Sequence, residues 1–210
     1  MPLFYQQDIN EHTRLAVWHI TEPEAFFLAK VPLKRDITHP NKRLQHLAGR
    51  YILQYLFPDF PYSEMLIADS RKPYLPDEQY HFSISHCGSY AAAIVSKEER
   101  VGIDIENITH KVARIRDKFL HKEENLFVAA QFPDEEAIPL LTILWSAKEA
   151  IFKWWSFGSV DFSEDIRLAE FTFSANGGEM DGIFIRNTDI HAVHLHYRII
   201  GEISLVWTGK

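Results

Sequence analysis

Two short motifs constrain this chain more than any other feature of its sequence. The first, Gly-Ile-Asp-Ile-Glu, contains Asp104 and ends at Glu106, and the second, Trp-Ser-Ala-Lys-Glu-Ala-Ile-Phe-Lys, contains Glu149 and ends at Lys153. In a β-strand the side chains alternate between faces, so Asp104 and Glu106 are expected to point the same way. On a helix, residues four apart share a face, which places Glu149 beside Lys153. A fold that joins this strand to this helix brings three carboxylates and one ammonium group together.

Three carboxylates without a cysteine favour a hard cation such as Mg²⁺, which prefers oxygen ligands and usually keeps substrate phosphates in its shell. The two motifs therefore predict Mg²⁺-dependent chemistry on a phosphate or diphosphate. Each motif also has an ordinary interpretation, because two acids on a strand can simply face solvent and a Glu–Lys pair is common on helix surfaces. Gly102, which permits close approach of a ligand, and the aromatic residues Trp145 and Phe152 favour the functional interpretation.

Length and composition are those of a globular protein. The 210 residues suffice for one large domain or two halves, and 46% hydrophobic with 24% charged residues argues against disorder. No apolar run approaches the ~20 residues of a membrane span, and the first residues lack a signal-peptide pattern. Cys87 is alone, which fits a reducing cytoplasm, and the net charge of −7 disfavours nucleic-acid binding.

Hydrophobic periodicity predicts an α+β protein. The expected strands are 15–20, 80–84, 90–96 and 101–106, and the expected helices are 22–29, 41–57, 108–131 and 140–155. Hairpin turns are expected at 176–178 and 181–182, followed by a closing strand pair at 191–200 and 202–207. This order indicates two similar α/β subdomains, 1–100 and 101–210, packed as one compact unit.

Three further segments carry groups suited to phosphate. Ser85 and His86 are expected at a strand end or in the turn that follows, where their donors can hold phosphate oxygens. Lys72 and Pro73 lie in a rigid basic loop, for which two interpretations are open. The loop contacts a nucleotide, or it only connects two secondary-structure elements. A basic region between residues 30 and 50 indicates a small anionic ligand or an acidic partner, with a solvated helix face as the alternative.

Two groups of potentially reactive residues, one at Cys87 and one of histidines near the C-terminal end, are predicted to have no catalytic or metal-binding role. Cys87 follows His86 directly, but adjacent residues rarely face one another, so a cysteine nucleophile is not predicted. His194 and His196 share one face of a predicted strand, near His191, and that arrangement can bind a transition metal. Because no cysteine or acid in the pattern supports them, the prediction is an ordinary strand surface.

Taken together, the motifs resemble the 4′-phosphopantetheinyl transferase superfamily, and in particular its longer, two-halved type that activates the surfactin synthetase. The family signature pairs a Gly-Ile/Val-Asp strand with Trp/Phe-Ser-x-Lys-Glu-x-x-x-Lys, and both parts are intact here. Lys72-Pro73 and Ile84-Ser85-His86 match its other motifs, and the likeness spans residues 43–162. Arg71 and Cys87 depart from the pattern, and the residues before Lys42 match none of it.

The resemblance implies transfer of the 4′-phosphopantetheine arm of coenzyme A to a serine of an apo acyl or peptidyl carrier protein. The by-product is adenosine 3′,5′-bisphosphate, and Mg²⁺ is the cofactor. The implied fold is a pseudo-dimer of two related halves in one chain, with coenzyme A contacts in 1–100 and the metal site and carrier docking in 101–210. A cytoplasmic monomer that binds neither nucleic acid nor membrane is expected.

The resemblance also implies roles for individual residues. Asp104, Glu106 and Glu149 would hold Mg²⁺, while Glu149 and Lys153 act in catalysis, as base and as stabiliser of the phosphoryl oxygens. The residues implied in coenzyme A binding are Arg43, Arg50, Lys72, Pro73, Ser85, His86 and Lys153, with Arg43 or Arg50 on the 3′-phosphate.

Basic residues interleaved with Phe119 and Leu120 make Lys111–Glu124 the candidate docking segment for an acidic carrier protein. The alternative is a plain exposed helix. Two rival functions stay open: a non-catalytic coenzyme A-binding module of the same fold, and a different Mg²⁺ phosphotransferase. Neither common nucleotide-binding glycine fingerprint occurs in the chain, which disfavours the second rival.

Overall fold

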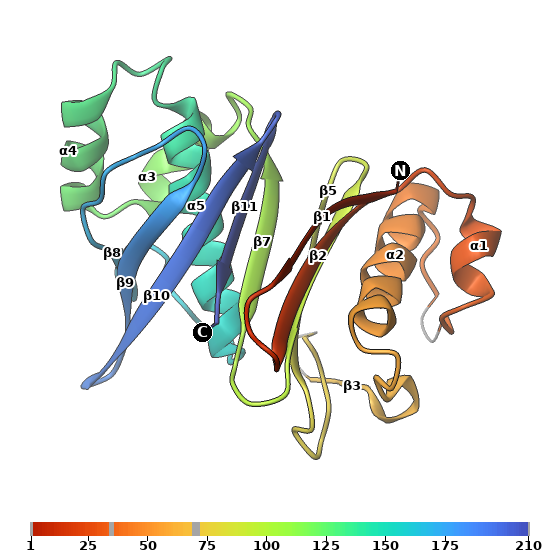
Figure 1. Ribbon diagram of the computed structural model, residues 1–210. Coiled ribbons are helices and arrows are strands. Elements are labelled where there is room, and N and C mark those ends of the chain that lie inside the picture. Colours follow the sequence, from red (N-terminus) through yellow and green to blue (C-terminus); the bar gives the residue numbers. More distant parts are fainter. Residues whose placement is uncertain (1, 34–35, 69–71, 210) are drawn as a thin grey trace. The chain divides into compact units, whose positions relative to one another are not determined.

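The computed structural model describes residues 2–33, 36–68 and 72–209. The chain divides into two compact units (Figure 1): unit 1 contains the described residues up to Ile103 together with Gly209, and unit 2 is Asp104–Thr208. Each unit has a hydrophobic core of its own, built mainly from strand residues and from the buried face of one long helix.

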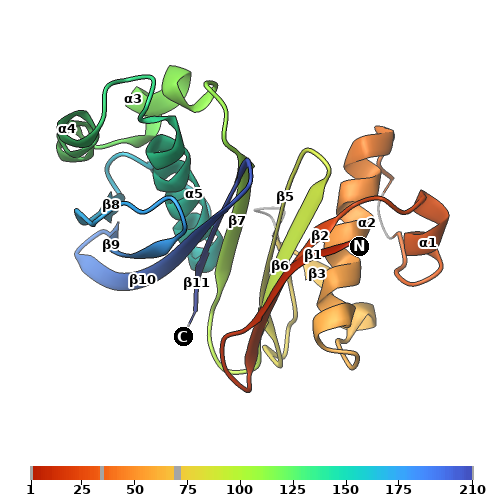
Figure 2. The same cartoon turned by 45° about the horizontal axis from the view of Figure 1, so that its top comes forward.

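Unit 1 is an antiparallel sheet covered by helices. Its four strands lie in the order β1 (Leu3–Asp8), β2 (Thr13–His19), β6 (Tyr90–Ser96) and β5 (His81–Cys87). Helix α2 (Pro40–Leu56) packs on β2, β5 and β6, and α1 (Glu24–Leu28) packs beside α2 (Figure 2). The remaining elements are η1 (Tyr62–Glu64) and the short strand pair β3 (Leu66–Ile67) and β4 (Pro73–Tyr74).

The close packing of α2 on its sheet depends on one glycine. A Cβ atom added at Gly49 would lie 2.6 Å from Cγ2 of Ile84 on β5, closer than real carbon contacts allow. The neighbouring residues Leu47, Ala48, Ile52 and Leu53 are fully buried on the same helix. Gly49 therefore sets how near α2 can approach β5, which carries Ser85 and His86 in the same unit.

Unit 2 contains a five-stranded sheet and the other long helix. The sheet order is β7 (Gly102–Asn107), β11 (Ile203–Thr208), β10 (Asp189–Ile200), β9 (Gly178–Arg186) and β8 (Ile166–Leu168). Helix α5 (Ile138–Trp155) packs against β8, β10 and β11, as Figure 1 shows. The connection from β7 to α5 contains η2 (Val112–Ile115), α3 (Arg116–Phe119) and α4 (Lys122–Gln131).

Helix α5 is buried around most of its circumference. Its first two turns contain almost only apolar residues, the pattern of a core helix rather than of an amphipathic surface helix. The partly exposed side chains include Trp145, Glu149 and Lys153, which recur every four residues and so form one stripe. The helix ends at Ser156, which adopts a left-handed conformation with φ of 74°.

The chain is a mixed α and β protein with several sheets, as expected from its sequence, and its long helices and closing hairpin lie close to their predicted positions. Four details of the prediction are wrong or incomplete. The strand at 3–8 was not predicted, β5 continues through Cys87 instead of turning at His86, the expected helix 108–131 is interrupted, and 181–182 lies inside β9. The hairpin turn instead falls at Asn187, whose short polar side chain tolerates its positive φ of 55°.

In the described part of the chain, no helix has both the length and the apolar character that crossing a membrane requires.

Candidate functional site

An ion pair joins the two motifs that the sequence singles out. Asp104 on β7 is buried, and its Oδ1 lies 2.6 Å from Nζ of Lys153 on α5. The Lys153 side chain is 21% exposed, so the pair lies at the margin of the unit and not in its core. The expected convergence of strand and helix is therefore present for these two residues.

Glu106 lies two residues further along β7 and is only partly exposed. Burial, followed by the negative charge of Asp104, raises the pKa of Glu106 to about 7. A hydrogen bond from Trp145 and the positive charge of Lys153 act in the opposite direction. At neutral pH this carboxyl group is thus divided between its protonated and ionised forms, a property that concentrates at functional sites.

Trp145 on α5 contacts this cluster in a way that its sequence does not predict. Its indole N–H is the donor to Glu106, and its ring is held between Phe119 and Phe162, at centroid distances of 5.2 and 5.6 Å. The available signal was its position four residues before Glu149 on the same helix, which places it on the stripe that continues to Lys153.

Glu149 completes the cluster from the middle of the stripe. Burial is the main cause of a raised pKa for Glu149, and the charge of Asp104 adds to it, while Lys153 opposes both. A carboxylate whose pKa lies above its ordinary value accepts a proton more readily at neutral pH. The charges of Asp104, Glu149 and Lys153 shift the pKa of Glu106, and those of Asp104 and Lys153 shift the pKa of Glu149, so the four residues act on one another.

The donor set suits a hard divalent cation by charge and by ligand type. With all three carboxylates ionised, Lys153 balances one of them and leaves two negative charges, the charge that one Mg²⁺ offsets. The three carboxylates do not close around a single point: in residues 2–33, 36–68 and 72–209, the one group of three potential ligands within 4.8 Å of each other lies elsewhere in unit 2. Mg²⁺ commonly uses one or two carboxylates together with water and substrate phosphate, so this separation does not disqualify the site.

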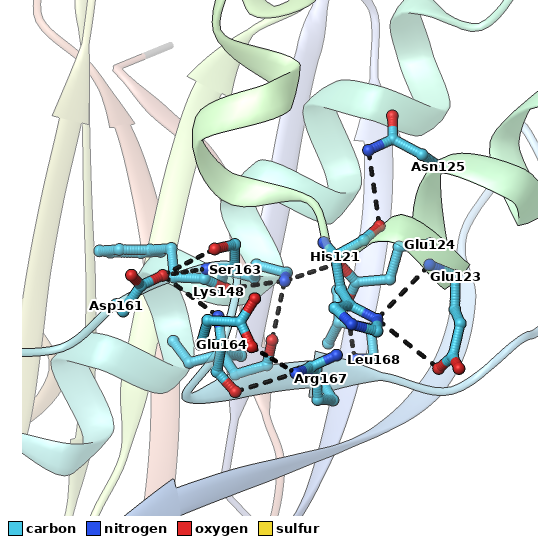
Figure 3. Close-up of polar contacts among 12 residues, drawn as sticks. His121, Glu123, Glu124, Asn125, Lys148, Asp161, Ser163, Glu164, Arg167 and Leu168 are labelled. Carbon is cyan, nitrogen blue, oxygen red and sulfur yellow. Dashed lines mark hydrogen bonds and ion pairs between the residues drawn. The ribbon is translucent and has the colours of Figure 1, made fainter.

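The lysine next to Glu149 has a different, structural environment. Lys148 is fully buried, and its Nζ donates hydrogen bonds of 2.8 Å to the carbonyl oxygens of both Phe162 and Ile166. It also forms an ion pair with Glu124 at 2.7 Å, as Figure 3 shows. Burial lowers the pKa of Lys148, and the charge of Glu124 opposes that effect. The adjacent residues Lys148 and Glu149 therefore have different environments on α5: Lys148 is buried in a polar network, and Glu149 lies on the partly exposed stripe.

Glu124 connects three segments of unit 2 through this buried pair. One carboxylate oxygen accepts from the backbone N–H of Leu168 on β8 at 2.8 Å, and the other accepts from the N–H of His121 at 2.7 Å (Figure 3). The second bond belongs to a capping box that begins α4. Sequence alone gives little sign of this role, since Lys148 and Glu124 are 24 positions apart.

The expected coenzyme A residues Ser85 and His86 lie in unit 1, in the regular part of β5. Ser85 pairs with Ala92 and His86 with Ala91, so the two side chains project from opposite faces of the sheet. Ser85 is buried and His86 is exposed. Both residues lie near the end of β5, which is one of the two expected positions, and the turn itself begins only at Gly88.

Arg43 and Arg50 lie on α2, seven residues apart. The guanidinium of Arg43 forms an ion pair with Glu24 on α1 at 2.9 Å and donates to the carbonyl of Ile37 at 3.0 Å. Arg50 lies 3.0 Å from Nδ1 of His46.

Lys72 precedes the strand β4, in which Pro73 pairs with Ile67. The backbone carbonyl of Lys72 accepts a 2.9 Å hydrogen bond from the N–H of Ala68. Arg71, which departs from the family pattern, lies outside the described residues, as do Lys34 and Arg35 of the basic region.

The candidate docking segment 111–124 differs from its prediction. Phe119 and Leu120 belong to the core of unit 2, at 0% and 4% exposure, so they offer no apolar surface. Its basic residues Lys111, Arg114, Lys118 and Lys122 are exposed. A large exposed apolar side chain does occur close by, at Leu126 on α4.

Comparison with known proteins identifies the family. Residues 100–204, half of the chain, match the model of the 4′-phosphopantetheinyl transferase superfamily. The chain therefore belongs to that superfamily, which confirms the resemblance of its motifs. The match includes both motifs of the candidate site.

Curated relatives show the same affiliation. Enterobactin synthase component D of Escherichia coli (strain K12) is 36% identical over 116 residues, covering 53% of this chain and 54% of the relative. The protein of the same name from Salmonella austin is 35% identical over 115 residues, covering 53% and 47%. The 4′-phosphopantetheinyl transferase gsp of Aneurinibacillus migulanus is 28% identical over 109 residues, covering 51% and 44%. The chain thus spans about half the length of the curated relatives it matches.

Proposed function

We propose that this chain transfers the 4′-phosphopantetheine arm of coenzyme A to a serine hydroxyl of an apo carrier protein. The observation that carries the proposal is the cluster of Asp104, Glu106, Glu149 and Lys153 in unit 2, in a chain that belongs to the 4′-phosphopantetheinyl transferase superfamily. A relative that bears the transferase name supports the same activity.

In the proposed reaction, the serine oxygen attacks the diphosphate phosphorus that carries the pantetheine arm. A new phosphorus–oxygen bond forms, and the bond to the adenosine half breaks, so that adenosine 3′,5′-bisphosphate leaves with the electron pair. The serine proton passes to Glu149, directly or through water. Positioning and electrostatics supply most of the rate enhancement in such transfers.

The other residues of the cluster would bind the metal ion, stabilise the phosphoryl oxygens and position the Glu106 carboxylate. Asp104, Glu106 and Glu149 would hold Mg²⁺, which supplies charge neutralisation on the diphosphate when bound. Lys153 stabilises the non-bridging phosphoryl oxygens. Trp145 holds the Glu106 carboxylate through its indole N–H and limits its freedom to turn away from the cluster.

For coenzyme A we propose contacts from unit 1. Ser85 and His86 lie on β5, which is an edge strand; a diphosphate that runs along this edge can contact the exposed His86 directly, whereas contact with the buried Ser85 requires that its hydroxyl become accessible. Lys72 and Pro73 would contact the nucleotide, and Arg43 or Arg50 the 3′-phosphate. Contact with Arg43 requires that the phosphate compete with Glu24.

The carrier protein would dock on the exposed basic residues of the segment 111–124. Carrier proteins of this class are acidic around their serine, so Lys111, Arg114, Lys118 and Lys122 offer charge complementarity. Leu126 replaces the buried Phe119 and Leu120 as the apolar contact.

We further propose that the two units are related halves of one enzyme that acts as a cytoplasmic monomer. Each unit has a sheet with one long helix packed on it, α2 in unit 1 and α5 in unit 2. In this arrangement 1–100 contributes to coenzyme A binding and 101–210 contains the metal site and the docking segment. Light scattering tests the monomer, and a stable trimer contradicts it.

The activity is tested by incubating the protein with coenzyme A, Mg²⁺ and a panel of apo carrier proteins, followed by intact-mass measurement of the carriers. We expect one carrier to gain about 340 Da, the mass of the transferred arm. Replacement of the carrier serine by alanine should abolish the gain. The carrier that reacts fastest identifies the partner class.

The site is tested with a matched pair of variants. Glu149→Gln removes the proposed base and metal ligand, and Glu170→Gln makes the same chemical change at an exposed glutamate outside the cluster. We expect loss of transfer only in the first variant. Coenzyme A binding without transfer to any carrier would instead support the non-catalytic binding module.

A further inference from the structure

A second cluster of potential metal ligands lies in unit 2, on the hairpin of β9 and β10. In this hairpin Glu179 pairs with His196 and Asp181 pairs with His194. Residues two apart on a strand share a face, so all four side chains project from the same side of the sheet. Val193 and Leu195, which alternate with the two histidines along β10, point into the core. The register therefore places two imidazoles and two carboxylates together, a combination that strand periodicity alone cannot show.

The carboxylate–imidazole distances are close to the spacing of ligand atoms around a tetrahedral metal ion, with each imidazole facing a different oxygen of Glu179. Glu179 Oε2 lies 3.5 Å from His194 Nε2, and Glu179 Oε1 lies 3.3 Å from His196 Nδ1. Ligand atoms about 2.1 Å from a tetrahedral ion stand about 3.4 Å apart. One ligand atom from each of the three residues lies within 4.8 Å of the other two.

The surroundings hold both imidazoles in position. Asp181 Oδ1 lies 2.7 Å from His194 Nδ1, which leaves Nε2 directed at Glu179. A carboxylate on the second ring nitrogen is the usual outer-shell partner of a metal-bound histidine, because it fixes the tautomer and strengthens the ligand. His196 stacks on the buried ring of Trp207, with centroids 5.4 Å apart and 19° between the planes.

From this arrangement we propose that Glu179, His194 and His196 bind a divalent transition-metal ion of the Zn²⁺ class. Two imidazoles and one carboxylate are borderline ligands that suit Zn²⁺, whereas Mg²⁺ prefers oxygen alone. The carboxylates of Glu179 and Asp181 balance the ion's charge. The side chains of Glu179 and His194 are 64% and 42% exposed, so water occupies the fourth position. The ion would cross-link β9 to β10, and its ligands are different residues from those of the proposed transfer site.

The experiment is a Zn²⁺ titration of the full, untagged chain against a chromophoric chelator, with millimolar Mg²⁺ present to occupy the acidic transfer site. We expect one Zn²⁺ per chain. His194→Gln and His196→Gln should each weaken binding at least tenfold, and Asp181→Asn by about tenfold to a hundredfold, as outer-shell changes usually do. His191→Gln, on the same strand but its opposite face, is the matched control and should bind as the native chain does.

A second readout excludes binding at the transfer site. The Co²⁺-loaded chain should show the visible absorption of a tetrahedral site, and this absorption should persist in Glu149→Gln and disappear in His196→Gln. Zn²⁺ should also raise the melting temperature of the native chain but not of His194→Gln. Zn²⁺ binding unchanged in both His194→Gln and His196→Gln, or no saturable binding at all, would overturn the proposal whatever the transfer activity.

Discussion

Replacement of Lys148 by methionine tests the structural role of this buried residue, which directly precedes the proposed catalytic residue Glu149 on α5. Methionine keeps most of the length of the side chain but removes the ammonium group. The carbonyl oxygens of Phe162 and Ile166 then each lose a 2.8 Å hydrogen bond, and the Glu124 carboxylate loses its buried counter-charge. Breaking a buried pair by removing one partner typically costs about 3–5 kcal/mol.

The expected loss is directly measurable. Urea unfolding can be followed by tryptophan fluorescence, because Trp145, Trp154, Trp155 and Trp207 lie in unit 2 and only Trp18 lies in unit 1. With a urea m-value of about 2 kcal/mol/M, a loss of about 4 kcal/mol moves the midpoint down by about 2 M. If the native chain is too marginal for this loss, Glu124→Gln offers a milder change that keeps one carbonyl oxygen as acceptor.

Two further variants make the test specific. The double variant Lys148→Met/Glu124→Gln leaves no buried charge, so it should recover part of the loss, and the double-mutant cycle isolates the pair. Lys153→Met removes the other lysine of the same helix and should abolish transfer, whereas Lys148→Met should not act on the transfer site directly. Because Asp104 is buried, its loss of a counter-charge should also lower the midpoint, but by less than the loss of the fully buried Lys148 ammonium group. A cost below about 1 kcal/mol for Lys148→Met would refute the reasoning, since a fully buried ammonium cannot be removed so cheaply.

Three other outcomes are expected. Because the pKa of Glu106 in the folded chain is about 7, against an ordinary 4.5, the folded state retains a proton that the unfolded state releases between these values. The metal-free chain should therefore lose stability as the pH rises through this window, measured by urea unfolding, while transfer and Mg²⁺ binding increase with pH. Gly49→Ala should destabilise the chain by about 1–3 kcal/mol despite the better helix propensity of alanine, because its Cβ collides with Ile84. Lys118→Glu should raise the KM for the carrier several-fold with kcat unchanged, and salt should reduce the difference, as steady-state kinetics can show.

Each of these outcomes has a control. Glu106→Gln should flatten the dependence of stability on pH, and an unchanged slope would show that another group causes it. Ile84→Ala should lower the cost of Gly49→Ala, and additive effects would contradict the proposed collision. Lys42→Glu reverses an exposed charge in unit 1, and an equal rise in KM there would argue against docking at the segment 111–124.

The candidate transfer site was largely predictable because its geometry is local. Alternation on a strand determines that Asp104 and Glu106 can act together, and four-residue spacing on a helix does the same for Glu149 and Lys153. One tertiary contact, the 2.6 Å pair between Asp104 and Lys153, then joins the two motifs. The roles of these residues in metal binding and catalysis remain predictions.

Errors in the prediction fall where long-range packing overrides local pattern. Gly182 reads as a turn residue, yet it lies within β9, where a Cβ would come within 3.0 Å of Leu168 and 3.2 Å of Ile151. A glycine needed for close packing is indistinguishable in sequence from one needed for a turn. Phe119 and Leu120 likewise read as docking residues, but the core of unit 2 takes up both.

The sequence by itself determined the family, the α and β composition and the residues that can share a strand or helix face, because these follow from motif identity and from periods of 2.0 and 3.6 residues. Only the tertiary structure decided which faces meet. Lys148 is separated by 24 positions from its partner Glu124, and Glu179 by 15 and 17 from His194 and His196. No local period encodes such pairings, since strand register and helix packing are set by burial of the whole core.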